Sequence, residues 1–132
     1  MRILIEEEPP RTTHQSGTKI GPRGTYKSAN LKKAEQYFRK HLKDYVPDEP
    51  LTGPIKLATT WKYKAKTKKQ DMTWKETKPD TDNLPKTLKD IMTELGFWGD
   101  DAIVTYETIK KIWSTSPGLE IEIETLEKRM ES

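Results

Sequence analysis

The chain has 132 residues and a mass of 15.3 kDa; 32% of its residues are hydrophobic and 34% are charged. This length fits one small domain, and no apolar run approaches the roughly 20 residues that a membrane-spanning helix needs. The chain has no cysteine and only two histidines. This excludes disulfides and thiolate metal sites and gives little support to histidine-based ones. Any catalysis is therefore expected to use carboxylates, lysines or a bound hard metal ion.

The net charge of +3 is unevenly distributed along the chain. Residues 11–78 contain 17 basic and 6 acidic residues, whereas residues 79–132 contain 6 basic and 12 acidic ones. This division favours a polyanionic partner together with a local acidic site, although a mixed solvated surface would also produce it. The apolar start of the chain is interrupted at Glu6 and does not resemble a signal peptide, so we expect a cytoplasmic protein.

The first part of the chain predicts a strand, a long loop and a helix. Residues 2–6 form the strand, and residues 11–27 are expected to be a basic, flexible loop, because Pro22 and three glycines interrupt this region. Ser28 is a suitable N-cap for a helix that continues to about Lys43. Apolar residues at spacings of three and four give this helix its buried face: Leu31, Ala34, Phe38, Leu42 and Tyr45.

Residues 55–67 alternate between two kinds of side chain. The odd positions are mostly apolar or aromatic, and lysines fill the even positions further along, so a strand would place the two sets on opposite faces. A line of lysines suits a phosphate backbone. It favours DNA binding by Lys62, Lys64, Lys66 and Lys68. An edge strand that uses lysines to prevent aggregation is the alternative.

The second part predicts a helix, two strands and a frayed tail. The helix begins near Asp82 or Asn83 and ends at Leu95, because Gly96 can adopt the left-handed conformation that stops it. The strands are expected over residues 102–113 and 119–125, and the tail over residues 127–132. The order of elements predicts a single α+β domain over residues 1–132, with a mixed β-sheet packed with two main helices.

Four carboxylates flank this second helix. Asp80 and Asp82 precede it and, in an extended segment, project to the same side, whereas Asp100 and Asp101 follow it. If the two pairs converge they need a cation, and Mg²⁺, or Mn²⁺ in its place, prefers such oxygen ligands. The ion would polarise a phosphodiester and supply hydroxide at neutral pH, and Lys86 would stabilise the developing charge. Helix capping and ordinary turns are the alternatives, and the convergence itself is a hypothesis.

Two motifs follow one another in this region: Asp80-x-Asp82-Asn83-Leu84-x-Lys86 and, after Asp90, Gly96-Phe97-Trp98-Gly99-Asp100-Asp101. In this order they resemble the RusA family of Holliday junction resolvases, which phages and prophages often carry. The resemblance implies a RusA-like fold and a Mg²⁺-dependent, homodimeric endodeoxyribonuclease. Such an enzyme resolves four-way DNA junctions by symmetric phosphodiester hydrolysis during recombination and repair.

The resemblance also implies roles for single residues. The metal ligands would be Asp80, Asp82, Asp101 and, in a supporting role, Asp100. Lys86 would be catalytic or would contact DNA. Pro79 is a departure from the family, because some relatives have a basic residue directly before the first aspartate, and here Lys78 lies one place earlier.

We expect branched DNA and a second copy of the chain as partners, and neither a membrane nor an organic cofactor. Besides the four strand lysines, the residues expected to bind DNA are Arg11, Lys19, Arg23, Lys27 and Lys78. The helix over residues 83–95 and the strand over residues 103–113 are the candidate dimer surfaces. Two other functions stay open: a nuclease for other branched DNA such as flaps or forks, and a non-catalytic nucleic-acid-binding protein.

Overall fold

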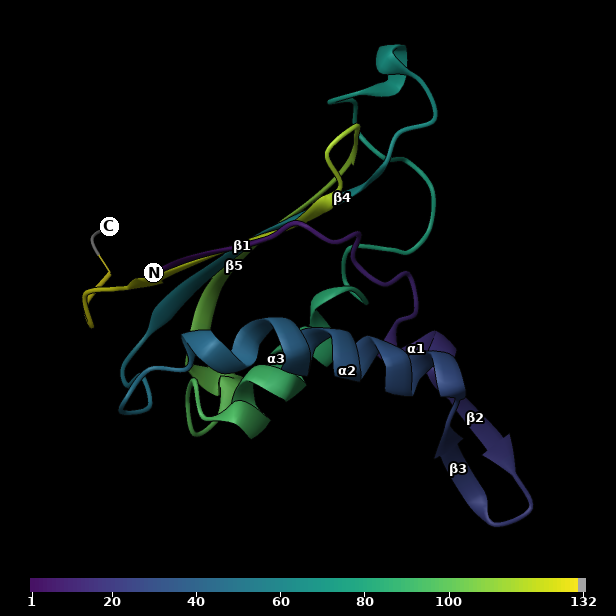
Figure 1. Cartoon of the computed structure of the whole chain (residues 1–132). Helices are drawn as coiled ribbons and strands as arrows, with labels where there is room; N and C mark the ends of the chain where they lie inside the picture. The colour runs from purple at the N-terminus through teal and green to yellow at the C-terminus, as the bar shows by residue number, and fades with distance from the viewer. Residues whose placement is uncertain (131–132) are drawn as a thin grey trace.

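The computed structural model describes residues 1–130. Its centre is a four-stranded sheet with the strand order β1-β6-β4-β5. The strands are β1 (Arg2–Ile5), β4 (Ile55–Lys64), β5 (Val104–Ser114) and β6 (Gly118–Thr125). β4 and β5 run parallel, whereas the other neighbours are antiparallel. This mixed sheet with helices packed on it confirms the predicted α+β fold (Figure 1).

Two long helices lie on one side of the sheet, α2 (Ala29–Leu42) and α3 (Pro85–Leu95) (Figure 1). As predicted, Ser28 caps α2, because its hydroxyl oxygen accepts the N–H of Leu31 at 3.2 Å. Gly96 ends α3 in the left-handed conformation, with a φ of 96°. α3 begins later than predicted, so that Asp82 lies in the turn before it. Residues 1–130 also contain three 3₁₀ helices: η1 (Lys43–Tyr45), η2 (Lys68–Gln70) and η3 (Asp101–Ile103).

The hydrophobic core lies between these two helices and the sheet. β4 alternates as predicted, and its buried members pack with α2 and α3 in one cluster that includes Ile55, Leu57, Trp61, Tyr63, Phe38 and Leu88. The strand ends at Lys64, so it is shorter than predicted. Lys66 lies beyond it and Lys68 begins η2. The predicted line of four strand lysines is therefore reduced to Lys62 and Lys64.

The segment over residues 11–27 is not the flexible loop that the sequence predicted. It forms α1 (His14–Gly17) and the antiparallel hairpin of β2 (Thr18–Gly21) and β3 (Gly24–Lys27). Thr13 and Ser16 cap α1 reciprocally, and Gly21 pairs with Gly24 across a two-residue turn. The hairpin projects away from the sheet (Figure 1). Prolines and glycines that indicated a loop thus close a tight turn within regular structure.

β5 forms one edge of the sheet. The segment before α3 covers only one end of its outer edge. There the N–H of Lys75 donates to the carbonyl oxygen of Lys111 at 3.0 Å, and the N–H of Trp113 donates to that of Thr73 at 2.9 Å. Within residues 1–130, no backbone partner is found on the outer edge of β5 before Lys110.

The end of the chain adds little regular structure. Of the predicted frayed tail, residues 127–130 form neither helix nor strand, and residues 131 and 132 lie outside the described part of the chain. In residues 1–130, no helix combines the length and the apolar character that are needed to cross a bilayer.

Candidate active site

Lys111 of β5 fixes the backbone of the segment that leads to Asp80. Its ammonium donates to the carbonyl oxygens of Thr77 and Pro79, each at 2.7 Å. Hydrogen bonds from a charged donor are stronger than those between neutral groups. The position of the first candidate aspartate therefore depends on a lysine that is about 30 residues further along the chain.

Lys75 supports the same segment from the interior. Only 4% of this residue is exposed, and its ammonium donates to the carbonyl oxygen of Lys78 at 2.7 Å. The ammonium also lies 4.4 Å from the ring centre of Trp113, close enough for a cation–π contact. Burial lowers the pKa of Lys75, and the nearby charges of Arg11 and Lys111 lower it further. Two ammonium groups thus hold the backbone before Asp80.

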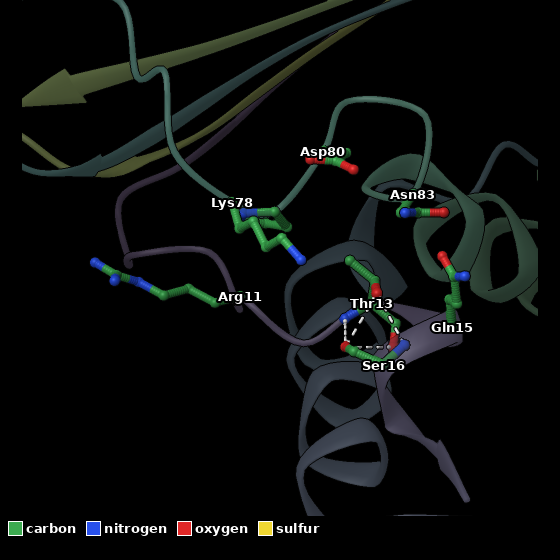
Figure 2. Close-up of a pocket in the computed structure, with 8 residues that line it drawn as sticks. Arg11, Thr13, Gln15, Ser16, Lys78, Asp80 and Asn83 are labelled. Atoms are coloured by element: carbon green, nitrogen blue, oxygen red, sulfur yellow. Dashed lines mark hydrogen bonds between the residues drawn. The ribbon is translucent and has the colours of Figure 1, made fainter.

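Asp80 faces a cavity of about 570 Å³ between this segment and α1. Lys78, Asn83 and Arg11 line the cavity with it, and Thr13, Gln15 and Ser16 line its α1 side. Figure 2 shows Lys78, Asp80 and Asn83 on one side and the α1 residues on the other. Asp80 is therefore surrounded by basic and neutral polar side chains in this cavity, and no second carboxylate lines it.

A second cavity brings together acidic residues from the two ends of α3. Asp82 comes from the turn before the helix, and Asp101 comes from η3 after it. Lys86, in the first turn of α3, lines the same cavity. Asp82, Asp101 and Lys86 thus line one cavity, whereas Asp80 lines the other.

A turn with buried side chains connects the end of α3 to η3, which lines this cavity through Asp101. Trp98 is buried, and its indole N–H donates to the hydroxyl oxygen of Thr93 at 2.7 Å. Asp100 then caps η3 by accepting the N–H of Ala102 at 2.9 Å. Asp100 therefore supports Asp101 by fixing the turn in which Asp101 lies, and it does not line the cavity itself.

Glu107 of β5 lines the same cavity and was missed by the sequence analysis. It points toward the helices because it lies opposite Leu57 in the parallel register of β4 and β5. Lys89 donates to its Oε1 at 3.0 Å, whereas its Oε2 is buried without a hydrogen-bond partner in residues 1–130. A buried polar atom that is left unpaired costs about 1–3 kcal/mol, and more when it is charged. The sequence contained one indication of this: in a strand, Glu107 lies on the same face as the apolar Ile103 and Ile109.

The donor set of this cavity fits a hard divalent cation. Carboxylate oxygens are the ligands that Mg²⁺ prefers, and Oε2 of Glu107 has no competing partner within the described chain. As the side chains stand, no three acidic or histidine residues among residues 1–130 are grouped tightly enough to hold an ion. Side-chain movement in this cavity would therefore have to accompany metal binding.

The basic residues predicted to bind DNA are distributed over several surfaces. Lys62 lies on the face of the sheet opposite to the acidic cavity and forms an ion pair with Glu120 at 3.2 Å. Lys27 of β3 forms an ion pair with Glu35 at 2.8 Å. The other predicted residues are exposed: Arg11, Lys19, Arg23, Lys64, Lys66, Lys68 and Lys78. Their contacts with DNA stay a prediction.

Comparison with known proteins places the chain in a family. The family model described as Endodeoxyribonuclease RusA matches residues 7–124. A protein of Lactococcus phage r1t named crossover junction endodeoxyribonuclease rusA is 41% identical over 70 residues, which are 53% of this chain and 53% of that protein. The match therefore spans about half the length of the phage relative. The uncharacterized protein YqaN of Bacillus subtilis (strain 168) is 26% identical over 121 residues, covering 77% of this chain and 84% of that protein. Because the family model matches most of its length, the chain belongs to the endodeoxyribonuclease RusA family.

Proposed function

We propose that this protein is a structure-specific endodeoxyribonuclease that resolves four-way DNA junctions by hydrolysing phosphodiester bonds at symmetric positions. Its family and the name of its phage relative support this function. The observation that carries the proposal is the cavity that Asp82, Asp101 and Lys86 line together. Such hydrolysis uses a cation, which carboxylates can bind, and acts on a phosphate, which the lysine can bind. The proposed place of action is the cytoplasm of a bacterial host.

Each residue of the cavity has a separate role in this proposal. Asp82 and Asp101 are the ligands of a divalent cation, Mg²⁺ or Mn²⁺. When bound, the cation would polarise the scissile phosphate and promote the formation of hydroxide at neutral pH. Lys86 contacts the phosphate oxygens and stabilises the negative charge that develops on them. Asp82 lies in the turn before α3 and Lys86 in its first turn, and both line the same cavity.

Asp80 is proposed as a further metal ligand that reaches the cation after a change in its side-chain direction. It is exposed and lies two residues from Asp82. Asp80→Asn should therefore weaken the binding of Mn²⁺ to the protein without DNA. Unchanged Mn²⁺ binding together with altered DNA binding would instead assign Asp80 to the cavity that it shares with Lys78 and Arg11.

The hairpin of β2 and β3 is proposed to contact one arm of the junction. It carries Lys19 and Arg23 away from the body of the protein (Figure 1), and both are exposed. Contacts with phosphates release counterions and make binding salt-dependent. Replacement of either residue by alanine should reduce the slope of log Kd against log salt concentration by about one, and an unchanged slope would exclude that residue.

A second copy of the chain is the proposed protein partner, because two symmetric incisions need two symmetric active sites. The outer edge of β5 before Lys110 is the proposed dimer surface, since no backbone partner covers it in the described residues. Tyr106, on this part of the strand, is 51% exposed. α3 is less suited to this role, because its buried residues belong to the core.

Incubation of the purified protein with a labelled synthetic four-way junction tests the proposed function. The wild type should produce paired, symmetric nicks with Mg²⁺ and none without it. Asp101→Asn should bind the junction without nicking it. Asp90→Asn is the matched control, because Asp90 is exposed on α3 and does not line the cavity. Binding without Mg²⁺-dependent nicking would indicate a non-catalytic DNA-binding protein, and preferential cutting of flaps or forks would identify a different branched substrate.

A further inference from the structure

We propose that Glu107 is a further ligand of the divalent cation in this cavity, and that Lys89 is an exchangeable counterion that holds Glu107 until the cation arrives. This inference rests on the proposed function, since it concerns the same cavity. It adds a residue from β5 to a site whose other acidic residues flank α3.

The first support is the environment of the Glu107 carboxylate. Its side chain is 22% exposed, and it points from the sheet into the cavity that Asp82 and Asp101 line. One oxygen accepts from Lys89, and the other is buried without a partner in residues 1–130. A glutamate with only a structural role would be expected to satisfy both oxygens, because buried polar atoms are nearly always paired. The unpaired oxygen has almost no accessible surface as the side chain stands, so the carboxylate would have to turn for this oxygen to reach a ligand in the cavity.

The second support is the cation that already lies at this carboxylate. The Lys89 ammonium is 3.0 Å from Oε1 of Glu107, and both side chains are about four-fifths buried. Three carboxylates and two lysines line the cavity, so its acidic groups exceed its basic ones even with Lys89 in place. A divalent cation would supply more positive charge than one ammonium and would bind oxygens that Lys89 leaves unused.

The ion pair with Lys89 gives Glu107 a partner for which a divalent cation would have to compete. While Lys89 holds Glu107, one carboxylate is occupied by a monovalent cation instead of converging with Asp82 and Asp101. Displacement of Lys89 would release both oxygens of Glu107 toward the cavity. Lys89 therefore competes with the metal for Glu107, and the two residues should affect metal affinity in opposite directions.

Titration of the full-length protein with Mn²⁺ in the absence of DNA, followed by electron paramagnetic resonance, tests this competition. Glu107→Gln should weaken Mn²⁺ binding at least tenfold, because even the loss of a residue that only supports a ligand weakens binding by about 10–100-fold. Lys89→Met should strengthen Mn²⁺ binding, because it removes the competing cation. Lys110→Met, on the exposed part of the same strand, is the matched control and should leave the affinity unchanged.

Unchanged Mn²⁺ affinity in Glu107→Gln, or weakened affinity in Lys89→Met, would overturn the inference. If Asp82→Asn and Asp101→Asn lose Mn²⁺ binding while Glu107→Gln keeps it, the inference fails and the proposed function stands. If the wild type binds no Mn²⁺, both fail. Circular dichroism of each variant identifies any loss of folding, and Glu107→Asp, which keeps the charge, should retain more Mn²⁺ affinity than Glu107→Gln.

Discussion

Lys86 and Lys89 lie less than one turn apart on α3 and line the same cavity, yet their surroundings differ. Lys89 is partly buried and paired with Glu107. Lys86 is exposed, and no ion pair joins it to an acidic residue of the described chain. A lysine that is not already neutralised can bind an incoming phosphate. The geometry therefore separates the two lysines into one that balances the protein's own charge and one that is available to the substrate.

Lys86→Met should lower the rate of junction cleavage about 100-fold or more, because it removes a charge that stabilises the transition state. Junction affinity should change much less, since many other basic residues contribute to it. Single-turnover cleavage and a binding titration measure the two effects separately. Lys33→Met, at an exposed position of α2, is the control. Equal losses of affinity and rate would show that Lys86 only helps to bind DNA.

At the scale of elements, the acidic cavity depends on the segment between β4 and α3. Lys111 and Lys75 hold this segment by donating to three of its backbone carbonyls. β5 supplies Lys111 to the segment and Glu107 to the cavity. The strand thus holds the backbone that leads to Asp80 and supplies a carboxylate to the cavity that Asp82 lines.

Lys75 should make the free energy of unfolding depend on pH. Burial lowers the pKa of its ammonium below the ordinary value of 10.5. Between the folded-state pKa and 10.5, the unfolded chain therefore binds more protons than the folded protein. The contribution of Lys75 to the free energy of unfolding should rise with pH across that window. Denaturant unfolding of the wild type and Lys75→Met from neutral pH to about pH 10 measures it, and a pH-independent difference between them would contradict this account.

The elements that could be predicted from the sequence are those that are determined by residues close together in the chain. The side-chain alternation of Leu57, Trp61 and Tyr63 and the Ser28 cap are properties of short segments, and both are confirmed. The β2–β3 hairpin was missed because Gly21 and Gly24 indicate a turn without specifying that strands flank it. That Asp80 and Asp82 line different cavities was not predictable, since local sequence does not show that Lys111 binds the distant backbone of Thr77 and Pro79. Glu107 required the register of two parallel strands.

At the scale of the whole molecule, the two faces of the sheet differ in what they can do. The face that α2 and α3 cover contains the core and the acidic cavity. On the other face, Lys62 pairs with Glu120 and Arg2 pairs with Glu122. These glutamates of β6 balance part of the basic charge, so that face is mixed rather than uniformly basic. The exposed residues of the hairpin are better placed to bind DNA, because the hairpin projects freely (Figure 1).

The proposed dimer should depend on the exposed part of β5. Tyr106→Glu is expected to convert a dimer to a monomer in sedimentation equilibrium and to abolish paired nicking, because a charge would be buried in the interface. Tyr45→Glu, at an exposed tyrosine of η1, is the control. A Tyr106→Glu protein that stays dimeric would exclude this edge of the sheet as the interface.

The central claim is that the residues before and after α3 form one cation-binding site. The most direct measurement is the anomalous scattering of Mn²⁺ soaked into crystals of the wild-type protein. The account predicts a single strong peak per chain within bonding distance of carboxylate oxygens of both Asp82 and Asp101. Mn²⁺ bound at only one of these aspartates, or bound elsewhere while their shared cavity stays empty, would contradict it.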